Sequence, residues 1–157
     1  MNAITKRLRS RPDGNANPPV VPAVSTSGTA RLGRKTKDLV KQLEPGDVAV
    51  IGHRNIDRIA AEDLVASGIK VVLNNQPSSD DKYPNRGPLI LVDAGVRLID
   101  FGEDDDLFEL LNDGDRIQLD GPVLMRDGAR VATGVDQLKP DLDRRLATQQ
   151  EQIHLAL

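Results

Sequence analysis

His53 and Asp57 are the two residues whose types and spacing could perform acid–base chemistry, since an imidazole beside a carboxylate can serve as a general base. They follow the apolar run of residues 47–52, which is predicted to form a buried strand. The chain contains no cysteine, and no serine is placed to act as the nucleophile that would complete a relay with this pair. We therefore expect His53 to be a surface or capping histidine, and we assign no catalytic residue.

The acidic run Glu103–Asp106 has a composition that suggests a bound divalent cation. Successive carboxylates along a chain point in different directions, however, and the spacing of a calcium-binding loop is missing. Negative charge in the first turn of a helix is favourable to the helix dipole. The run is therefore interpreted as a solvated helix start, and we expect neither a metal ion nor a cofactor.

The loop that contains YPNRGP, residues 83–88, is the candidate binding loop. In open α/β sheets ligands bind beyond the carboxyl ends of the strands, and a glycine at a helix start leaves backbone amides open to an anion. An arginine there could form a forked contact with a carboxylate or a phosphate. A small ligand, a protein contact and a structured turn remain three interpretations of the candidate residues, which are Asn74, Tyr83, Asn85, Arg86 and Gly87.

Two similar stretches indicate how the chain positions this loop. Residues 64–72 read LVASGIKVV and residues 91–99 read LVDAGVRLI, so both combine an apolar helix end, a glycine and a β-branched run. Gly68 and Gly95 suit helix ends, where glycine adopts a positive φ without strain. Each stretch therefore predicts a helix, a glycine stop and a strand, and this alternation implies a parallel sheet. Asn55 is predicted to cap the first of these helices.

The last third of the chain changes character. Two Asp-Gly turns, at residues 120–121 and 127–128, lie within alternating apolar and polar residues, which is typical of antiparallel hairpins. From Val135 onward the spacing predicts a helix with one apolar stripe. The stripe either folds back onto the body or pairs between two copies of the chain, and it consists of Leu138, Leu142, Leu146, Ile153 and Leu157.

The 157 residues therefore divide into an arm over 1–28, an α/β domain over 29–135 and a C-terminal helix over 136–157. Residues 1–41 hold nine Lys and Arg against two acidic residues, so the basic arm contacts an anionic membrane surface or the chain's own body, or remains a solvated tail. The basic cluster Arg31–Lys35 is short and lacks aromatic residues, so we expect no nucleic acid partner. The absence of long apolar runs and of cysteine predicts a cytoplasmic protein.

Several stretches together resemble a known family. They are residues 28–74, YPNRGP at 83–88 and GDRIQLDG at 114–121. From about Gly28 to Gly134 the chain resembles the N-terminal half of the actinobacterial SteA-like proteins, also called cytokinetic ring proteins. The resemblance implies a cytoplasmic homodimer that acts at the division septum. Its partner there is a membrane-anchored SteB-like protein, and together they control a peptidoglycan hydrolase in cell separation.

The second half of that family resembles thiamin pyrophosphokinase, and its glycine- and aspartate-rich nucleotide motifs are absent from this chain. The resemblance therefore implies a fragment whose last helix begins the connection to a second domain. A weaker resemblance, to the swivelling phosphohistidine domain, concerns architecture. That domain carries its phosphoryl group on a histidine before a helix, whereas residues 84–88 contain no histidine, so this resemblance supports the fold and not the phosphotransfer.

The expected fold is α/β and of the swivelling β/β/α type. It has a central, mostly parallel sheet, an antiparallel hairpin layer, helices on one side and a C-terminal helix. The expected function is not enzymatic: an assembly and regulatory module of a cell-division protein that binds protein partners. The alternatives are a small-molecule or nucleotide-binding domain related to thiamin pyrophosphokinase-like proteins, and a degenerate phosphotransfer domain.

Overall fold

The computed structural model describes residues 25–80 and 82–156, so most of the predicted arm and the stripe residue Leu157 lie outside the described residues. Within the described part of the chain, no helix combines the length and the apolar character needed to cross a membrane. The first strand begins at Ser25, so the end of the predicted arm belongs to the sheet.

Four parallel strands form the middle of the sheet, in the order β1-β2-β3-β4. They are β1 (Ser25–Leu32), β2 (Asp47–Ile51), β3 (Val71–Asn74) and β4 (Arg97–Asp100). The sequence predicts the last three but not β1, because the residues that β1 buries are the small Gly28 and Ala30. A Cβ atom at position 28 would lie 2.7 Å from the carbonyl oxygen of Gly46, so the close approach to the next segment requires glycine.

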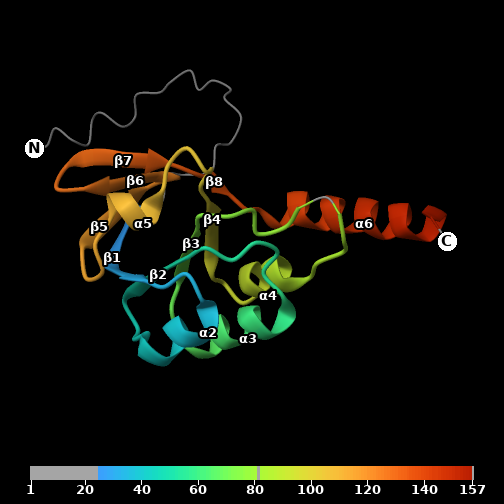
Figure 1. Cartoon of the computed structure of the whole chain (residues 1–157), viewed down its shortest axis with the longest axis horizontal. Coiled ribbons are helices and arrows are strands. Elements are labelled where there is room, and N and C mark those ends of the chain that lie inside the picture. The colour runs from blue at the N-terminus through green and yellow to red at the C-terminus, as the bar shows by residue number, and fades with distance from the viewer. Residues whose placement is uncertain (1–24, 81, 157) are drawn as a thin grey trace, which may run out of the picture.

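Three short helices cover one face of this sheet (Figure 1). They are α2 (Thr36–Leu39), which continues into the 3-10 turn η1 (Val40–Gln42), α3 (Arg58–Ala66) and α4 (Gly87–Asp93). The predicted helix–glycine–strand units are confirmed, since Gly68 follows α3 at φ 82° and Gly95 follows α4 at φ 86°. The apolar core on this face includes Ile51, Ile56, Leu64, Val72, Leu91 and Leu98.

The prediction that Asn55 caps α3 is wrong. Asp57 caps this helix, because its Oδ1 accepts a hydrogen bond from the backbone N of Ala60 at 2.8 Å. Asn55 lies two residues earlier, with a φ of 56° that asparagine tolerates better than most residues. Its side chain bonds to Asp80 in the loop after β3.

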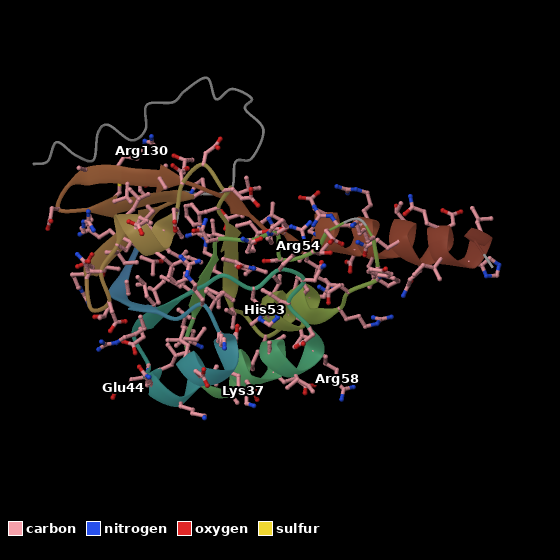
Figure 2. All side chains as sticks on the ribbon, viewed as in Figure 1. Lys37, Glu44, His53, Arg54, Arg58 and Arg130 are labelled. Carbon is pink, nitrogen blue, oxygen red and sulfur yellow. The ribbon has the colours of Figure 1, made fainter. Side chains whose placement is uncertain are left out.

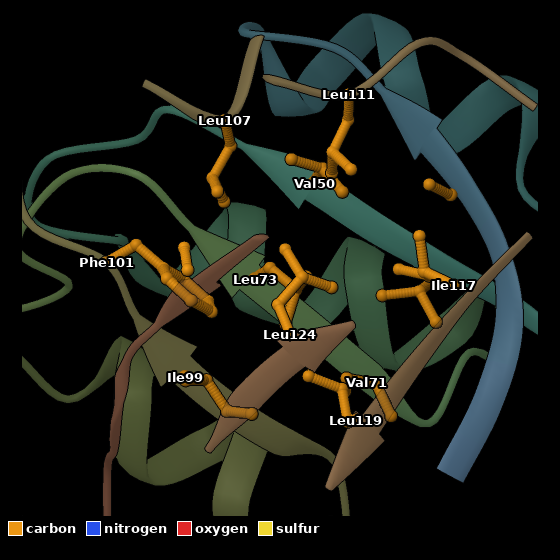
Figure 3. Close-up of a cluster of buried hydrophobic side chains, with 13 residues drawn as sticks. Val50, Val71, Leu73, Ile99, Phe101, Leu107, Leu111, Ile117, Leu119 and Leu124 are labelled. Carbon is orange, nitrogen blue, oxygen red and sulfur yellow. The ribbon is translucent and has the colours of Figure 1, made fainter. Parts of the chain in front are cut away.

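The opposite face is covered by the predicted antiparallel hairpins, β5 (Arg116–Asp120), β6 (Val123–Arg126) and β7 (Ala129–Thr133). β5 also pairs antiparallel with β1, which joins this layer to the parallel strands. The short helix α5 (Leu107–Leu110) begins directly after the acidic run, and Asp106 caps it. The sequence predicts the run Glu103–Asp106 in the first turn of this helix, but the run lies before the first turn. Figure 3 shows the second core, in which Ile117, Leu119 and Leu124 face Val50, Val71 and Leu73.

The chain after residue 134 begins with a strand and not with the predicted helix. Val135–Asp136 form β8, which pairs antiparallel with β4. The Asp136 carboxylate holds this segment extended by accepting two hydrogen bonds from the Arg97 guanidinium, at 2.9 and 2.8 Å. The last helix, α6 (Lys139–Ala156), therefore starts later, and Leu138 lies before it.

Gly134 is the single residue between β7 and β8, although these strands lie at opposite ends of the sheet order. The sheet therefore curls until its two ends meet. A Cβ atom at position 134 would lie 2.6 Å from Cγ2 of Ile99, so this junction also requires glycine. The predicted α/β class is confirmed: parallel central strands, an antiparallel hairpin layer, a helical layer and a C-terminal helix (Figure 1).

Candidate functional site

The loops that follow β2, β3 and β4 meet at one edge of the sheet, and Asn74 is the last residue of β3. Its fully buried side chain accepts hydrogen bonds from the backbone N of His53 at 3.0 Å and of Gln76 at 3.2 Å. Its Nδ2 donates to the carbonyl oxygen of His53 and to Oγ of Ser78, both at 2.9 Å. Asn74 therefore lies at the predicted edge, where its amide holds two loops together.

The predicted loop of residues 83–88 divides into structural and exposed residues. The Nδ2 of Asn85 donates to the carbonyl oxygen of Ser78 at 3.1 Å, and its Oδ1 accepts from the N of Gly87. Gly87 is buried so tightly that a Cβ atom would lie 1.8 Å from the carbonyl oxygen of Ile56. Tyr83 is 67% exposed, and Arg86 is exposed, with no hydrogen bond or ion pair from its side chain to any described residue. The five predicted residues therefore do not converge on one ligand position.

His53 and Asp57 do not form the acid–base pair that their spacing suggests. The Nδ1 of His53 lies 2.9 Å from Oγ1 of Thr36, a buried residue at the start of α2, while Asp57 caps α3. Figure 2 shows His53 and Arg54 on the loop that leaves β2. Over residues 25–80 and 82–156, no group of three or more His, Cys, Asp or Glu side chains is arranged to hold a metal ion.

Asn55 and Asp80 join this loop to the one after β3. The Nδ2 of Asn55 donates to Oδ2 of Asp80 at 2.9 Å, and its Oδ1 accepts from the backbone N of Asp80 at 2.7 Å. The hydrogen bonds from the backbone N of Lys82 and from Asn55 hold the pKa of Asp80 below its usual range. The Nε of Arg54 lies 3.5 Å from the same carboxylate. The two hydrogen bonds between Asn55 and Asp80 explain why Asn55 adopts a positive φ.

Asp100, the last residue of β4, is the polar residue at this edge that the sequence interpretation missed. Its Oδ2 accepts from the backbone N of Ser78 at 2.9 Å, and its Oδ1 accepts from Ser78 Oγ at 2.5 Å. Burial raises the pKa of Asp100 to about 6, although the bonds from Ser78 and the nearby charge of Arg145 act to lower it. Its position at the end of a predicted strand, equivalent to that of Asn74, is the signal that could have found it.

The predicted apolar stripe of α6 is split between the body and solvent. Leu142 and Leu146 are buried against Leu89 of α4, so the first half of the helix folds back onto the domain. Gln149 is also buried, and its Nε2 donates to the carbonyl oxygen of Asp80. The helix then runs past the body (Figure 1). Ile153 on the stripe is 38% exposed, Leu155 is 77% exposed, and Leu138 before the helix is 49% exposed.

A cleft of about 440 Å³ lies between the loops that follow β3 and β4 and the start of α6. We call it the β4–α6 cleft. Arg145 of α6 reaches it from one side, and its Nη1 donates to the carbonyl oxygen of Ser79 at 3.4 Å. The cleft has the size of an ordinary small-molecule site. Residues that line it include Ser79, Asp100, Glu103, Val135, Gln137 and Arg145.

Comparison with known proteins assigns no family: no protein-family model and no curated protein matches this chain. The solved structures that are similar to it include two of low sequence identity. One is the 3-isopropylmalate dehydratase leuD of Methanocaldococcus jannaschii, with 15% identity and a TM-score of 0.45 over 85% of this chain and 97% of that one. The other is an unusual member of the RraA family of RNase ES inhibitors from Streptomyces coelicolor. It has 14% identity and a TM-score of 0.43, over 87% of this chain and 77% of that one.

Proposed function

We propose that this chain is a non-catalytic assembly and regulatory module of a cell-division protein. It forms a homodimer and binds a membrane-anchored partner at the septum, so that peptidoglycan hydrolysis is controlled during cell separation. The resemblance of residues 28–134 to SteA-like proteins supports the cellular role. The observation that carries the assembly role is the second half of α6, which extends past the body with its apolar stripe only partly covered.

The stripe on α6 has the spacing of a helix-pairing surface. Leu142, Leu146, Gln149 and Ile153 follow one another at intervals of four, three and four residues, which places them on one face. The first three are buried on the domain, and Ile153 continues the same face into solvent. A short helix without packing contacts is marginally stable in water, so a partner surface that covers Ile153 would stabilise this end. A second copy of α6 offers the same face, and we propose that it is the partner.

Paired substitutions on the last turns of α6 test this proposal. Ile153 lies on the stripe, whereas Leu155 lies on the opposite side of the helix two residues later, so Leu155→Lys is a matched control for Ile153→Lys. We expect light scattering to give a dimer for the unchanged chain and for Leu155→Lys, and a monomer for Ile153→Lys. A monomeric unchanged chain, or a dimeric Ile153→Lys variant, would contradict the proposal.

The cell-division role needs its own experiment. In an actinobacterium that lacks its SteA-like protein, the same variants are introduced into the longest form of the protein that the genome encodes. We expect Leu155→Lys to restore the separation of daughter cells and Ile153→Lys to leave them attached. Equal rescue by both variants would show that the α6 surface has no role in cell division, whatever the oligomeric state of the variants.

The alternative of a nucleotide-binding domain has less support from the charges at the strand ends. Asp100 and Glu103 both line the β4–α6 cleft, and Arg145 is the one cation among the described residues that line it. A polyphosphate placed there would meet two carboxylates, and like charges at close range are unfavourable. The cleft therefore favours a ligand with less negative charge than a nucleotide.

A further inference from the structure

The β4–α6 cleft contains a carboxylate and a guanidinium that face one space without touching. Arg145 is near enough for its charge to lower the pKa of Asp100, yet no atoms of the two side chains lie within the 4.0 Å of an ion pair. Within the described residues, the guanidinium makes one long hydrogen bond, of 3.4 Å, to the carbonyl oxygen of Ser79. A guanidinium has five N–H donors, so most of this group's capacity is available to a ligand.

The other walls of the cleft combine polar and apolar groups. Ser79 is nine-tenths buried, and its Oγ makes only a 3.4 Å contact with the carbonyl oxygen of Asp80, which is at the limit of a hydrogen bond. Glu103 adds a second carboxylate on the β4 side. Pro77 and Val135 supply apolar surface. The cleft therefore presents two carboxylates, one guanidinium and apolar surface to one space.

We propose that the β4–α6 cleft binds a small aliphatic amino acid as its zwitterion. The ligand ammonium lies at Asp100 and Glu103, its carboxylate forms a forked contact with Arg145, and its side chain lies along Pro77 and Val135. This site goes beyond the proposed assembly function and does not depend on it. Two carboxylates against one guanidinium suit a ligand that carries one positive and one negative group, and they disfavour a simple anion.

Another groove of the molecule is less suited to such a ligand. It has a volume of about 520 Å³, but the described residues that line it all belong to α6, between Asp141 and Gln152. In that groove Arg144 is already paired with Asp141 on the next turn of the same helix. The β4–α6 cleft instead joins residues from the ends of β3 and β4, from β8 and from α6. A bound amino acid would therefore connect α6 to the edge of the sheet.

Calorimetry with three related probes tests the proposal. L-leucine carries both charges, isopentylamine lacks the carboxylate and 4-methylpentanoate lacks the ammonium group. For the unchanged chain we expect leucine to bind at least about tenfold more tightly than either analogue, because each charged group makes its own hydrogen bonds. Nuclear magnetic resonance spectra should show leucine shifting the backbone amides of Ser79 and Gly102.

Variants assign each half of the ligand to its residue. Arg145→Gln should remove the advantage of leucine over isopentylamine. Asp100→Asn should reduce its advantage over 4-methylpentanoate, and the double variant Asp100→Asn, Glu103→Gln should remove it. Arg144→Gln is the matched control, since Arg144 precedes Arg145 on α6 but is exposed and paired with Asp141, and it should bind leucine unchanged. The proposal is overturned if leucine binds no better than both analogues, or if Arg145→Gln, with native amide spectra, binds leucine as the unchanged chain does.

Discussion

The corner formed by Asn74 and residues 83–88 and the β4–α6 cleft are both rich in polar residues, but these residues are used differently. At the corner, Asn74 bonds to His53 in the loop after β2 and to Ser78, Asn85 bonds to Ser78 within its own loop, and Gly87 has no space for a side chain. In the cleft, Arg145 and Ser79 keep hydrogen-bonding capacity toward open space. Polar residues beyond a strand end therefore indicate a ligand site only where their bonding capacity remains available.

A glycine substitution at each place gives the largest expected difference between the two. In Gly87→Ala the new Cβ atom would lie 1.8 Å from the carbonyl oxygen of Ile56, so the backbone of the loop before α3 must shift. We expect the free energy of unfolding to fall by about 3 kcal/mol or more, measured by urea denaturation followed by circular dichroism.

Gly102→Ala is the control for that substitution at the cleft. Apart from its two chain neighbours, no atom of the described residues lies within 4 Å of a Cβ built there, and its φ is not in the positive range. The loss should remain below about 1 kcal/mol. Similar losses in the two variants would mean that the corner after β3 is not more tightly constructed than the cleft.

The pH dependence of Asp100→Asn gives the next largest effect. Burial raises the pKa of Asp100 from 3.8 to about 6, so the folded protein holds the proton more tightly than the unfolded chain does. The contribution of the neutral form to stability is fully present below pH 3.8 and is lost as the pH rises through about 6. The asparagine variant carries no such charge, so its stability relative to the unchanged chain should increase over this window.

The size of that change follows from the shift in pKa. A shift of about two units corresponds to roughly 3 kcal/mol for a fully buried group, and partial exposure of Asp100 reduces the expected change to about 2 kcal/mol. Thermal unfolding of both proteins between about pH 4 and pH 7 measures it. A constant difference across this range would show that Asp100 titrates near its ordinary value.

The smallest expected effects come from two neighbours in the predicted loop. Asn85→Ala loses the hydrogen bond to the carbonyl oxygen of Ser78 and should lower the free energy of unfolding by about 1 kcal/mol. Arg86→Ala removes an exposed side chain that contacts none of the described residues through a hydrogen bond or ion pair, and should change it by less than about 0.5 kcal/mol. Urea denaturation of both variants resolves the order, and a larger loss for Arg86→Ala would contradict it.

The sequence predicts the parts of this fold that depend on local chemistry. Gly68 and Gly95 indicate both helix–glycine–strand units, and the turn at Asp127 and Gly128 indicates the last hairpin, since positive φ restricts the residues that fit. β1 escapes prediction because Gly28 and Ala30 give no apolar pattern. β8 escapes because its pairing depends on Arg97, far away in the chain.

The candidate site is less predictable than the fold for the same reason. The sequence predicts that Asn74 lies at the sheet edge. It does not predict that Ser78 and His53 lie close enough to occupy both donors of the Asn74 amide. The cleft beside Asp100 exists because α6 returns across the strand ends and brings Arg145 to it. No local pattern in residues 97–102 or 139–149 predicts that Arg145 lies beside Asp100.

The two-residue pairing of β8 has a mechanical consequence. β8 is held to β4 by the register of Ile99 with Asp136 and of Asp100 with Val135, and it lies directly between the hairpin layer and α6. A pulling force applied along α6 would, once it has freed the contacts of α6 with the body, next load this ladder, which is among the shortest in the sheet. Peeling it away would move Val135 off the cleft before the main strands separate, so tension on the terminal helix would be felt at the cleft while the rest of the domain stays intact.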